Sequence, residues 1–167
     1  MKKEVEKLLQ YVQKPARYIG GELNAVVKDK DKVDIRYAFC FPDTYEIGMS
    51  HLGMKILYGL VNDREDSWCE RVFAPDNDME EQLRKNNVPL FALESGDYIK
   101  DFDMIGFTLQ YELSYTNVLN MLNLAQIPLK SSDRENLTPL ICVGGPCACN
   151  PEPITDFVDI VFLGDGE

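Results

Sequence analysis

The chain has 167 residues, 45% hydrophobic and 27% charged, which is typical of one globular domain and excludes a disordered or fibrous chain. Seventeen basic and 28 acidic residues give a net charge of −11, and without a local basic patch nucleic acid and anionic membranes are not expected partners. Five cysteines, an odd number, and an N-terminus without the apolar core of a secretory signal predict a cytoplasmic protein with reduced thiols. No apolar run has the length of a membrane span.

Residues 1–33 predict a short helical arm followed by a connector. Four apolar side chains recur at helical spacing before Pro15, which favours a helix boundary: Val5, Leu8, Leu9 and Val12. Residues 28–34 alternate basic and acidic side chains, as expected of a solvated connector. The main domain is therefore expected at residues 34–167.

Apolar runs rich in β-branched and aromatic residues predict the strands of this domain. They cover residues 34–41, 68–73, 103–109, 140–143 and 159–163, and a weaker candidate strand covers 90–93. Helices are predicted between the runs, at residues 45–61, 76–87, 114–126 and, as a short turn, 154–157. Ser114 is expected to cap the third of these helices.

The helix at residues 45–61 is expected to cover a sheet with its apolar stripe, which contains Ile47, Met49, Leu52, Met54, Ile56, Leu57 and Leu60. The opposite stripe, with Gly48, His51 and Asn62, is then expected to face solvent. Because helices alternate with continuously apolar strands, the sequence predicts a doubly wound α/β domain with a mostly parallel sheet, of the flavodoxin-like or Rossmann-like kind.

Ligands of such sheets bind beyond the carboxyl ends of the strands, so the loops at residues 42–48, 108–114 and 144–150 are the candidate site. The first loop offers Asp43, Thr44 and Tyr45 at a helix N-terminus. An equally simple interpretation is that Asp43 or Thr44 caps the helix and that Tyr45 packs against the core.

The second and third loops also have two interpretations. Thr108 and Gln110 place polar side chains at a strand end, although loops are commonly polar. Gly144 and Gly145 follow a buried strand, where paired glycines either let a backbone approach a ligand or form a tight turn.

Other groups of residues give weaker indications of a functional site. Cys142, Cys147 and Cys149 lie close in sequence, but no Cys-x-x-Cys pair exists and His51 is the only histidine, so buried or redox-silent thiols are favoured over a zinc site. His51 itself is expected to be a solvated side chain. The first strand is followed by neither a dinucleotide-binding fingerprint nor a phosphate-loop lysine, which argues against nucleotide hydrolysis. No catalytic residue and no metal ligand are predicted.

The three loops together resemble a known family. Asp43-x-Tyr45-x-x-Gly48, Thr108-x-Gln110 and Gly144-Gly145 follow the order of the cobalamin-binding domain, whose pattern is Asp-x-His-x-x-Gly, Ser-x-Leu and Gly-Gly. The segments PDTYEIGMSHLGMKILYGLVN, GFTLQYELSYTNVLNMLNLA and VGGPCACNPEPITDFVDIVFLGDGE resemble the N-terminal domain of radical S-adenosylmethionine (SAM) proteins. The resemblance covers residues 34–167, and residues 164–167 match the junction with a catalytic barrel.

The resemblance implies a fold of the cobalamin-binding type and a cofactor site made of Asp43, Thr44, Tyr45, Gly48, Thr108, Gln110, Gly144 and Gly145. Tyr45 stands where the family has the histidine that ligates cobalt, and a phenol is a poor replacement for imidazole. Thr108 and Gln110 also depart from the family's serine and leucine. The expected cobalamin site is therefore degenerate, and any binding is expected without a histidine ligand.

For the full-length protein, the resemblance implies SAM and an iron–sulfur cluster in a downstream barrel of the same chain, acting on an unknown substrate. The Cys-x-x-x-Cys-x-x-Cys motif that holds such a cluster is missing here, so this segment is expected to be non-catalytic by itself. The alternatives are a stand-alone protein-interaction module and a flavodoxin-like protein that binds flavin. The flavin interpretation is weakened because flavodoxins bind phosphate with a loop rich in Ser and Thr, and Thr44 is the only such residue in the first loop.

Overall fold

A computed structural model describes residues 2–164, and residues 165–167 of the expected barrel junction lie outside this range. One parallel sheet organises the chain. Its strands are β1 (Ile35–Phe41), β2 (Ser67–Phe73), β3 (Met104–Thr108), β4 (Leu140–Gly144) and β5 (Ile160–Val161). Their order across the sheet is β2-β1-β3-β4-β5, and every neighbouring pair is parallel. This is the flavodoxin-like strand order, so the predicted doubly wound α/β fold is confirmed.

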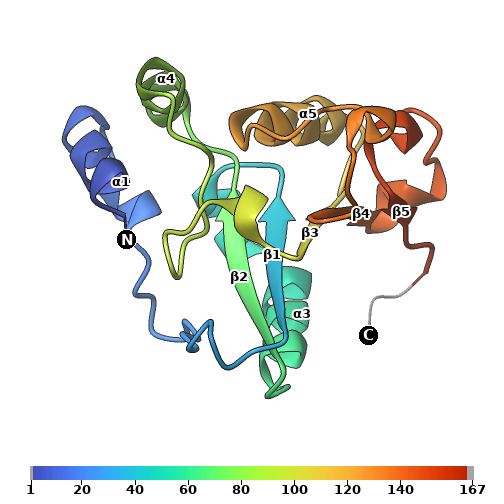
Figure 1. Cartoon of the computed structure of the whole chain (residues 1–167), viewed down its shortest axis with the longest axis horizontal. Helices are drawn as coiled ribbons and strands as arrows, with labels where there is room; N and C mark the ends of the chain where they lie inside the picture. Colours follow the sequence, from blue (N-terminus) through green and yellow to red (C-terminus); the bar gives the residue numbers. More distant parts are fainter. Residues whose placement is uncertain (1, 165–167) are drawn as a thin grey trace.

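The helices lie unevenly on the two faces of the sheet. They are α1 (Lys3–Leu8), α2 (Tyr45–Ser50), α3 (Leu52–Asn62), α4 (Asn77–Asn86) and α5 (Ser114–Leu124). Short 3₁₀ turns are η1 (Leu9–Tyr11), η2 (Pro15–Tyr18), η3 (Ile99–Asp101), η4 (Ser131–Asp133), η5 (Pro146–Cys149) and η6 (Thr155–Phe157). Figure 1 shows α4 and α5 on one side of the sheet and α3 on the other. Among residues 2–164, no helix combines the length and apolar composition that crossing a membrane requires.

The direction of the connections explains this asymmetry. The β1–β2 connection runs toward one edge of the sheet, whereas the connections from β2 to β3, β3 to β4 and β4 to β5 run toward the other. Crossovers between parallel strands are almost always right-handed, so the first must lie on one face and the other three on the opposite face. Within the described chain, β3, β4 and β5 therefore have no helix on the α3 side.

Two apolar cores result. The larger lies between the sheet and helices α4 and α5, and contains Ala38, Met79, Leu83, Ile105, Phe107, Val118, Met121, Leu122, Ile141 and Val143. Val5 and Leu8 of α1 are also buried in this core, so the predicted N-terminal arm packs onto the domain. The smaller core lies under α3 and contains Phe39, Phe41, Met54, Tyr58 and Cys69.

The predicted helix at residues 45–61 is wrong in two respects. The helix is broken at His51, which ends α2 and caps the N-terminus of α3 by accepting a hydrogen bond from the Met54 amide. Its buried face is also only partly the predicted one. Met54 is buried as predicted, but Tyr58 and Asn62 are buried with it, whereas Leu52, Ile56 and Leu60 are 43–68% exposed.

Side chains cover the outer edge of β2, which has no strand beside it. Lys28 Nζ donates to the Ser67 carbonyl at 2.7 Å, so Lys28 is not the solvated side chain that its charged segment predicts. Asn62 bonds both the amide and the carbonyl of Cys69 at 3.0 Å, which explains why this polar residue is buried. At Arg71, the amide donates to Glu94 at 2.7 Å and the carbonyl accepts from the Leu93 amide at 2.9 Å.

Three smaller predictions also need correction. Residues 90–93 form no strand, because they meet the edge of β2 through the single bond between Leu93 and Arg71. The predicted strand at 159–163 is limited to β5. Ser114 is the first residue of α5 and not its cap, and its Oγ donates back to the Tyr111 carbonyl at 2.6 Å.

Candidate functional site

A cavity lies beside α3, over the part of the sheet that has no helix on this face. Its volume is about 710 Å³. One wall is α3, the floor is formed by β1, β3 and β4, and the far rim is the chain that leaves β5. The lining residues are Tyr37, Phe39, His51, Gly53, Met54, Leu57, Val61, Met104, Gly106, Phe107, Thr108, Gln110, Cys142, Val143, Gly144, Gly145, Pro146, Cys149, Phe162, Leu163 and Gly164.

The floor is apolar because alternate residues of each strand face this side of the sheet. Tyr37 lies across Gly106 of the neighbouring strand, where any Cβ would overlap the phenol ring. Tyr37 also stacks on Phe39, with ring centroids 5.7 Å apart. Burial raises the pKa of the Tyr37 hydroxyl well above its usual value, so the phenol is neutral at physiological pH.

Polar groups gather at one end of the cavity. His51 Nδ1 accepts from the Met54 amide at 3.2 Å, and His51 Nε2 lies 3.1 Å from Gln110 Oε1. Since Nδ1 is an acceptor, the ring proton sits on Nε2 and is donated to Gln110. Gln110 Nε2 in turn donates to Thr108 Oγ1 at 2.6 Å. This chain of hydrogen bonds connects the start of α3 to the end of β3.

The paired glycines shape the loop that follows β4. Gly145 has a φ of +97°, and a Cβ there would lie 2.9 Å from the Leu109 carbonyl oxygen. The Leu109 amide donates to the Gly144 carbonyl at 2.7 Å, and the Cys147 amide donates to the Leu109 carbonyl at 3.1 Å. Close packing against Leu109 is therefore enough to require glycine at 145. Gly144 leaves the cavity floor open beside it.

The structure divides the eight predicted site residues into two groups. Thr108, Gln110, Gly144 and Gly145 line the cavity. The other four, from the first loop, lie outside its lining: Asp43, Thr44, Tyr45 and Gly48. The three loops therefore do not all meet at this cavity.

Asp43 and Tyr45 of the first loop have structural roles, whereas Thr44 stands at the N-cap of α2 without a side-chain cap hydrogen bond, so the expected side-chain cap is absent. Asp43 accepts from the Thr44 amide at 2.7 Å and from the Tyr111 hydroxyl. Tyr45 donates to Glu22 at 2.9 Å and packs edge-on against Phe73. Burial, followed by the bond to Glu22, raises the pKa of Tyr45 to about 12, so the phenol stays protonated.

Gly48 is required by packing alone. A Cβ at this buried position would overlap the ring of Phe73, which lies on the neighbouring strand β2. The match of Gly48 to a cofactor motif is therefore explained by the contact between a helix and the sheet.

The cysteines occupy different environments. Cys142 is buried in the cavity floor, and burial raises the pKa of its thiol to about 12. Cys149 is exposed at the cavity rim, and Cys147 is half-buried. Within residues 2–164, no three His, Cys, Asp or Glu side chains are grouped so as to hold a metal ion.

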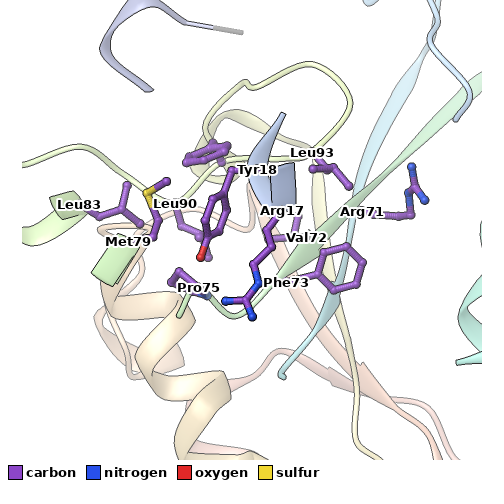
Figure 2. Close-up of a pocket in the computed structure, with 11 residues that line it drawn as sticks. Arg17, Tyr18, Arg71, Val72, Phe73, Pro75, Met79, Leu83, Leu90 and Leu93 are labelled. Carbon is purple, nitrogen blue, oxygen red and sulfur yellow. The ribbon is translucent and has the colours of Figure 1, made fainter. Parts of the chain in front are cut away.

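A second cavity lies on the other side of the domain, where the N-terminal arm meets β2 and α4. Figure 2 shows Tyr18 and Arg17 of η2 placed over Val72, Met79 and Leu90. Its volume of about 20 Å³ is room for about one water molecule, so the arm fills this site.

Three further residues that shape the large cavity were not predicted from the sequence: Tyr37, His51 and Gly106. His51 was expected to be solvated, but the break between α2 and α3 turns its ring toward Gln110. The sequence does contain one signal, because a residue that can accept a hydrogen bond three positions before Met54 is a possible helix cap. Tyr37 and Gly106 are brought together by strand pairing, which sequence spacing does not reveal.

Comparison with known proteins agrees with this architecture. The family model described as "Radical SAM proteins, N-terminal" matches residues 53–167. The uncharacterized protein MJ0966 of Methanocaldococcus jannaschii is 28% identical over 131 residues, which are 78% of this chain and 24% of that protein. The chain thus spans about a quarter of the length of this curated relative. No solved structure matches it significantly. With more than half of its length matched, the chain belongs to the family of N-terminal regions of radical SAM proteins.

Proposed function

We propose that this chain is a non-catalytic accessory domain of a radical SAM protein, and that its cavity holds the nucleotide tail of a corrinoid of the cobalamin class. The observation that carries the proposal is the position of the cavity. Its lining includes all four residues at the positions of the second and third parts of the cobalamin pattern: Thr108, Gln110, Gly144 and Gly145. A volume of about 710 Å³ suits a nucleotide-sized group, since small-molecule sites commonly measure about 300–1,000 Å³.

The chemistry of the lining fits a nucleotide tail. Tyr37 and Phe39 provide an aromatic floor against which a planar base can stack. Thr108 and Gln110 provide a hydroxyl and an amide for a ribose or a phosphodiester. The open backbone at Gly144 leaves space beside them. The described lining holds no Lys or Arg, so neutral donors would hold the tail.

The same residues do not supply a ligand to cobalt. Tyr45 is protonated, bonded to Glu22 and outside the cavity lining. Both ring nitrogens of His51 already take part in hydrogen bonds. A corrinoid in this domain would supply cobalt chemistry to the full-length protein, while the residues of this chain hold and orient its tail. The proposed site therefore lacks a metal ligand, and it also lacks the residues of the first loop, which lie outside the cavity lining.

Binding of hydroxocobalamin to the full-length protein tests the proposal. We expect the visible spectrum of a corrinoid that has lost its own base and gained no histidine ligand. Gly144→Leu places a side chain in the cavity and should weaken binding at least tenfold. Gly144→Ala is the matched control, because its Cβ would meet Phe162 Cβ at an ordinary 3.6 Å.

Two results would overturn the proposal. Absence of binding, or binding that Gly144→Leu does not weaken, would show that the cavity is not part of a corrinoid site. A histidine-ligated spectrum that disappears in His51→Ala would show instead that this chain does bind the cobalt.

A further inference from the structure

The outer surface of α3 is apolar and continuous with the cavity. Leu52, Ile56 and Leu60 recur every four residues and are 68%, 43% and 48% exposed. Leu57 and Val61 stand beside this stripe and line the cavity. At about 100° per residue, these five side chains form one apolar arc that runs from the cavity wall to the outside of the helix.

The opposite rim of the cavity is also apolar. Phe162 and Leu163, which follow β5, are 52% and 68% exposed and line the cavity. The α3 arc and this rim enclose a groove whose floor is the bare face of β3 and β4. The described lining contains no Asp, Glu, Lys or Arg, although the chain carries a net charge of −11. A continuous neutral surface of this kind marks an interaction site for an apolar partner.

We propose that this groove binds a helix from the polypeptide that follows residue 167 in full-length proteins of the family. All-parallel sheets are covered on both faces, and here one face lacks its cover over β3, β4 and β5. The matched family region is N-terminal, and the chain spans 24% of its curated relative, so these proteins have chain available to supply the cover.

The groove has the features that a helix requires. An α-helix with its side chains is about 10–12 Å across, and packed helices lie about 8–10 Å apart. Gly144 on the floor has no side chain, which favours a close approach there. Ile56 and Leu60 would then contact the incoming helix from the side. This inference does not depend on a corrinoid, because none of the observations that support it involves one.

Photochemical carbene labelling of the full-length protein, without corrinoid, tests the inference. Leu137 is an internal reference, because it is 72% exposed in the loop before β4 and does not line the groove. We expect Leu52, Ile56 and Leu60 to be labelled at least fivefold less than Leu137. Labelling in proportion to the exposures above would overturn the inference.

A pair of variants identifies the occupant. Ile56→Glu combined with Leu60→Glu places two charges on the arc and should raise the labelling of Leu52 and Phe162 at least threefold, whereas Leu137→Glu should not change it. Unchanged labelling in the double variant would contradict the inference. Sedimentation of the same samples tests whether a second copy of the chain covers the groove. A dimer, together with protection from labelling that is lost on dilution, would show self-association through the groove and overturn the proposal. Failure to bind hydroxocobalamin would change none of these readouts.

Discussion

His51 Nε2 lies 3.1 Å from Gln110 Oε1, and the same imidazole ring caps α3 through the Met54 amide. One side chain therefore holds the start of a helix and the end of a strand in a fixed relation. The connection also places the polar end of the cavity at the point where α2 and α3 separate. The ring is thus a structural link whether or not a ligand is bound.

Substitution of His51 separates its two roles. His51→Ala removes both the cap and the bond to Gln110, and should lower the free energy of unfolding by about 1–2 kcal/mol. His51→Asn keeps a good capping residue but is too short to reach Gln110, so it should lose less than half of that amount. Urea unfolding followed by circular dichroism measures both. Equal losses in the two variants would show that the cap contributes nothing.

Gly48 and Gly59 offer a matched pair of glycines in α2 and α3. Gly48→Ala forces a Cβ into the Phe73 ring and should destabilise the fold by about 1–3 kcal/mol. Gly59→Ala has open space and should stabilise it by about 0.5–1 kcal/mol, because alanine is the better helix former. Thermal unfolding of both variants checks the signs. A neutral Gly48→Ala would mean that the helix can shift away from the sheet.

Arg17 links the N-terminal arm to α2 and α4 through Glu46 and Asp76. Its hydrogen bonds lower the pKa of both carboxyls. A carboxyl with a lowered pKa stabilises the fold above its unfolded pKa and loses that contribution as the pH falls through its folded pKa. Arg17→Met should therefore be less stable than the wild type at pH 7, and the difference should shrink as the pH falls below about 4.

Urea unfolding at pH 7 and pH 3 tests this prediction. Lys14→Met is the control, because Lys14 is 63% exposed and reaches Glu46 at 3.4 Å, so its effect should be much smaller. A difference between Arg17→Met and the wild type that stays constant with pH would assign the role of Arg17 to packing.

The thiols should react in an order set by burial. At pH 8, a thiol with a pKa of about 12 is ionised to on the order of 10⁻⁴, so Cys142 should resist iodoacetamide until the protein unfolds. Buried Cys40 and Cys69 should resist likewise, whereas exposed Cys149 should react at least a hundredfold faster. Mass spectrometry of timed samples gives the order. Early alkylation of Cys142 would indicate that the cavity floor opens.

Asn62 is the residue whose loss should most affect the edge of β2. Asn62→Ala leaves the amide and the carbonyl of buried Cys69 without their partner, which should cost about 1–3 kcal/mol. Asn86→Ala is the control, because exposed Asn86 only donates to the Gln82 carbonyl at the end of α4. Urea unfolding of the pair should show a large effect at 62 and a small one at 86. Equal effects would mean that water replaces the side chain of Asn62.

The strand pattern could be predicted because β1, β3 and β4 are largely buried and their sequences are mainly apolar. The orientation of α3 could not. The prediction assumed that the most apolar stripe covers the sheet. Of that stripe Met54 does so, but Tyr58 lies beside it in the core, and the pairing of Asn62 with Cys69 fixes that rotation. The exposed apolar stripe through Ile56 indicates an interaction surface. A single sequence does not distinguish an apolar stripe that binds a partner from one that faces the core.

The candidate site was predicted in part for a similar reason. Thr108 and Gly144 were found because strand ends of a parallel sheet meet at one edge. Tyr45 was placed with them by the spacing of a motif, although its partner is Glu22 from the N-terminal arm. A contact between residues 23 positions apart on opposite sides of a strand has no local signature in the sequence.

The side chains along β2 also determine how the domain can associate with other proteins. Lys28, Asn62 and Glu94 occupy the backbone groups that an added strand would need, and the opposite edge strand, β5, has two residues. Neither edge of the described sheet therefore offers a template for edge-to-edge pairing. Strand exchange and association through added strands are thereby disfavoured.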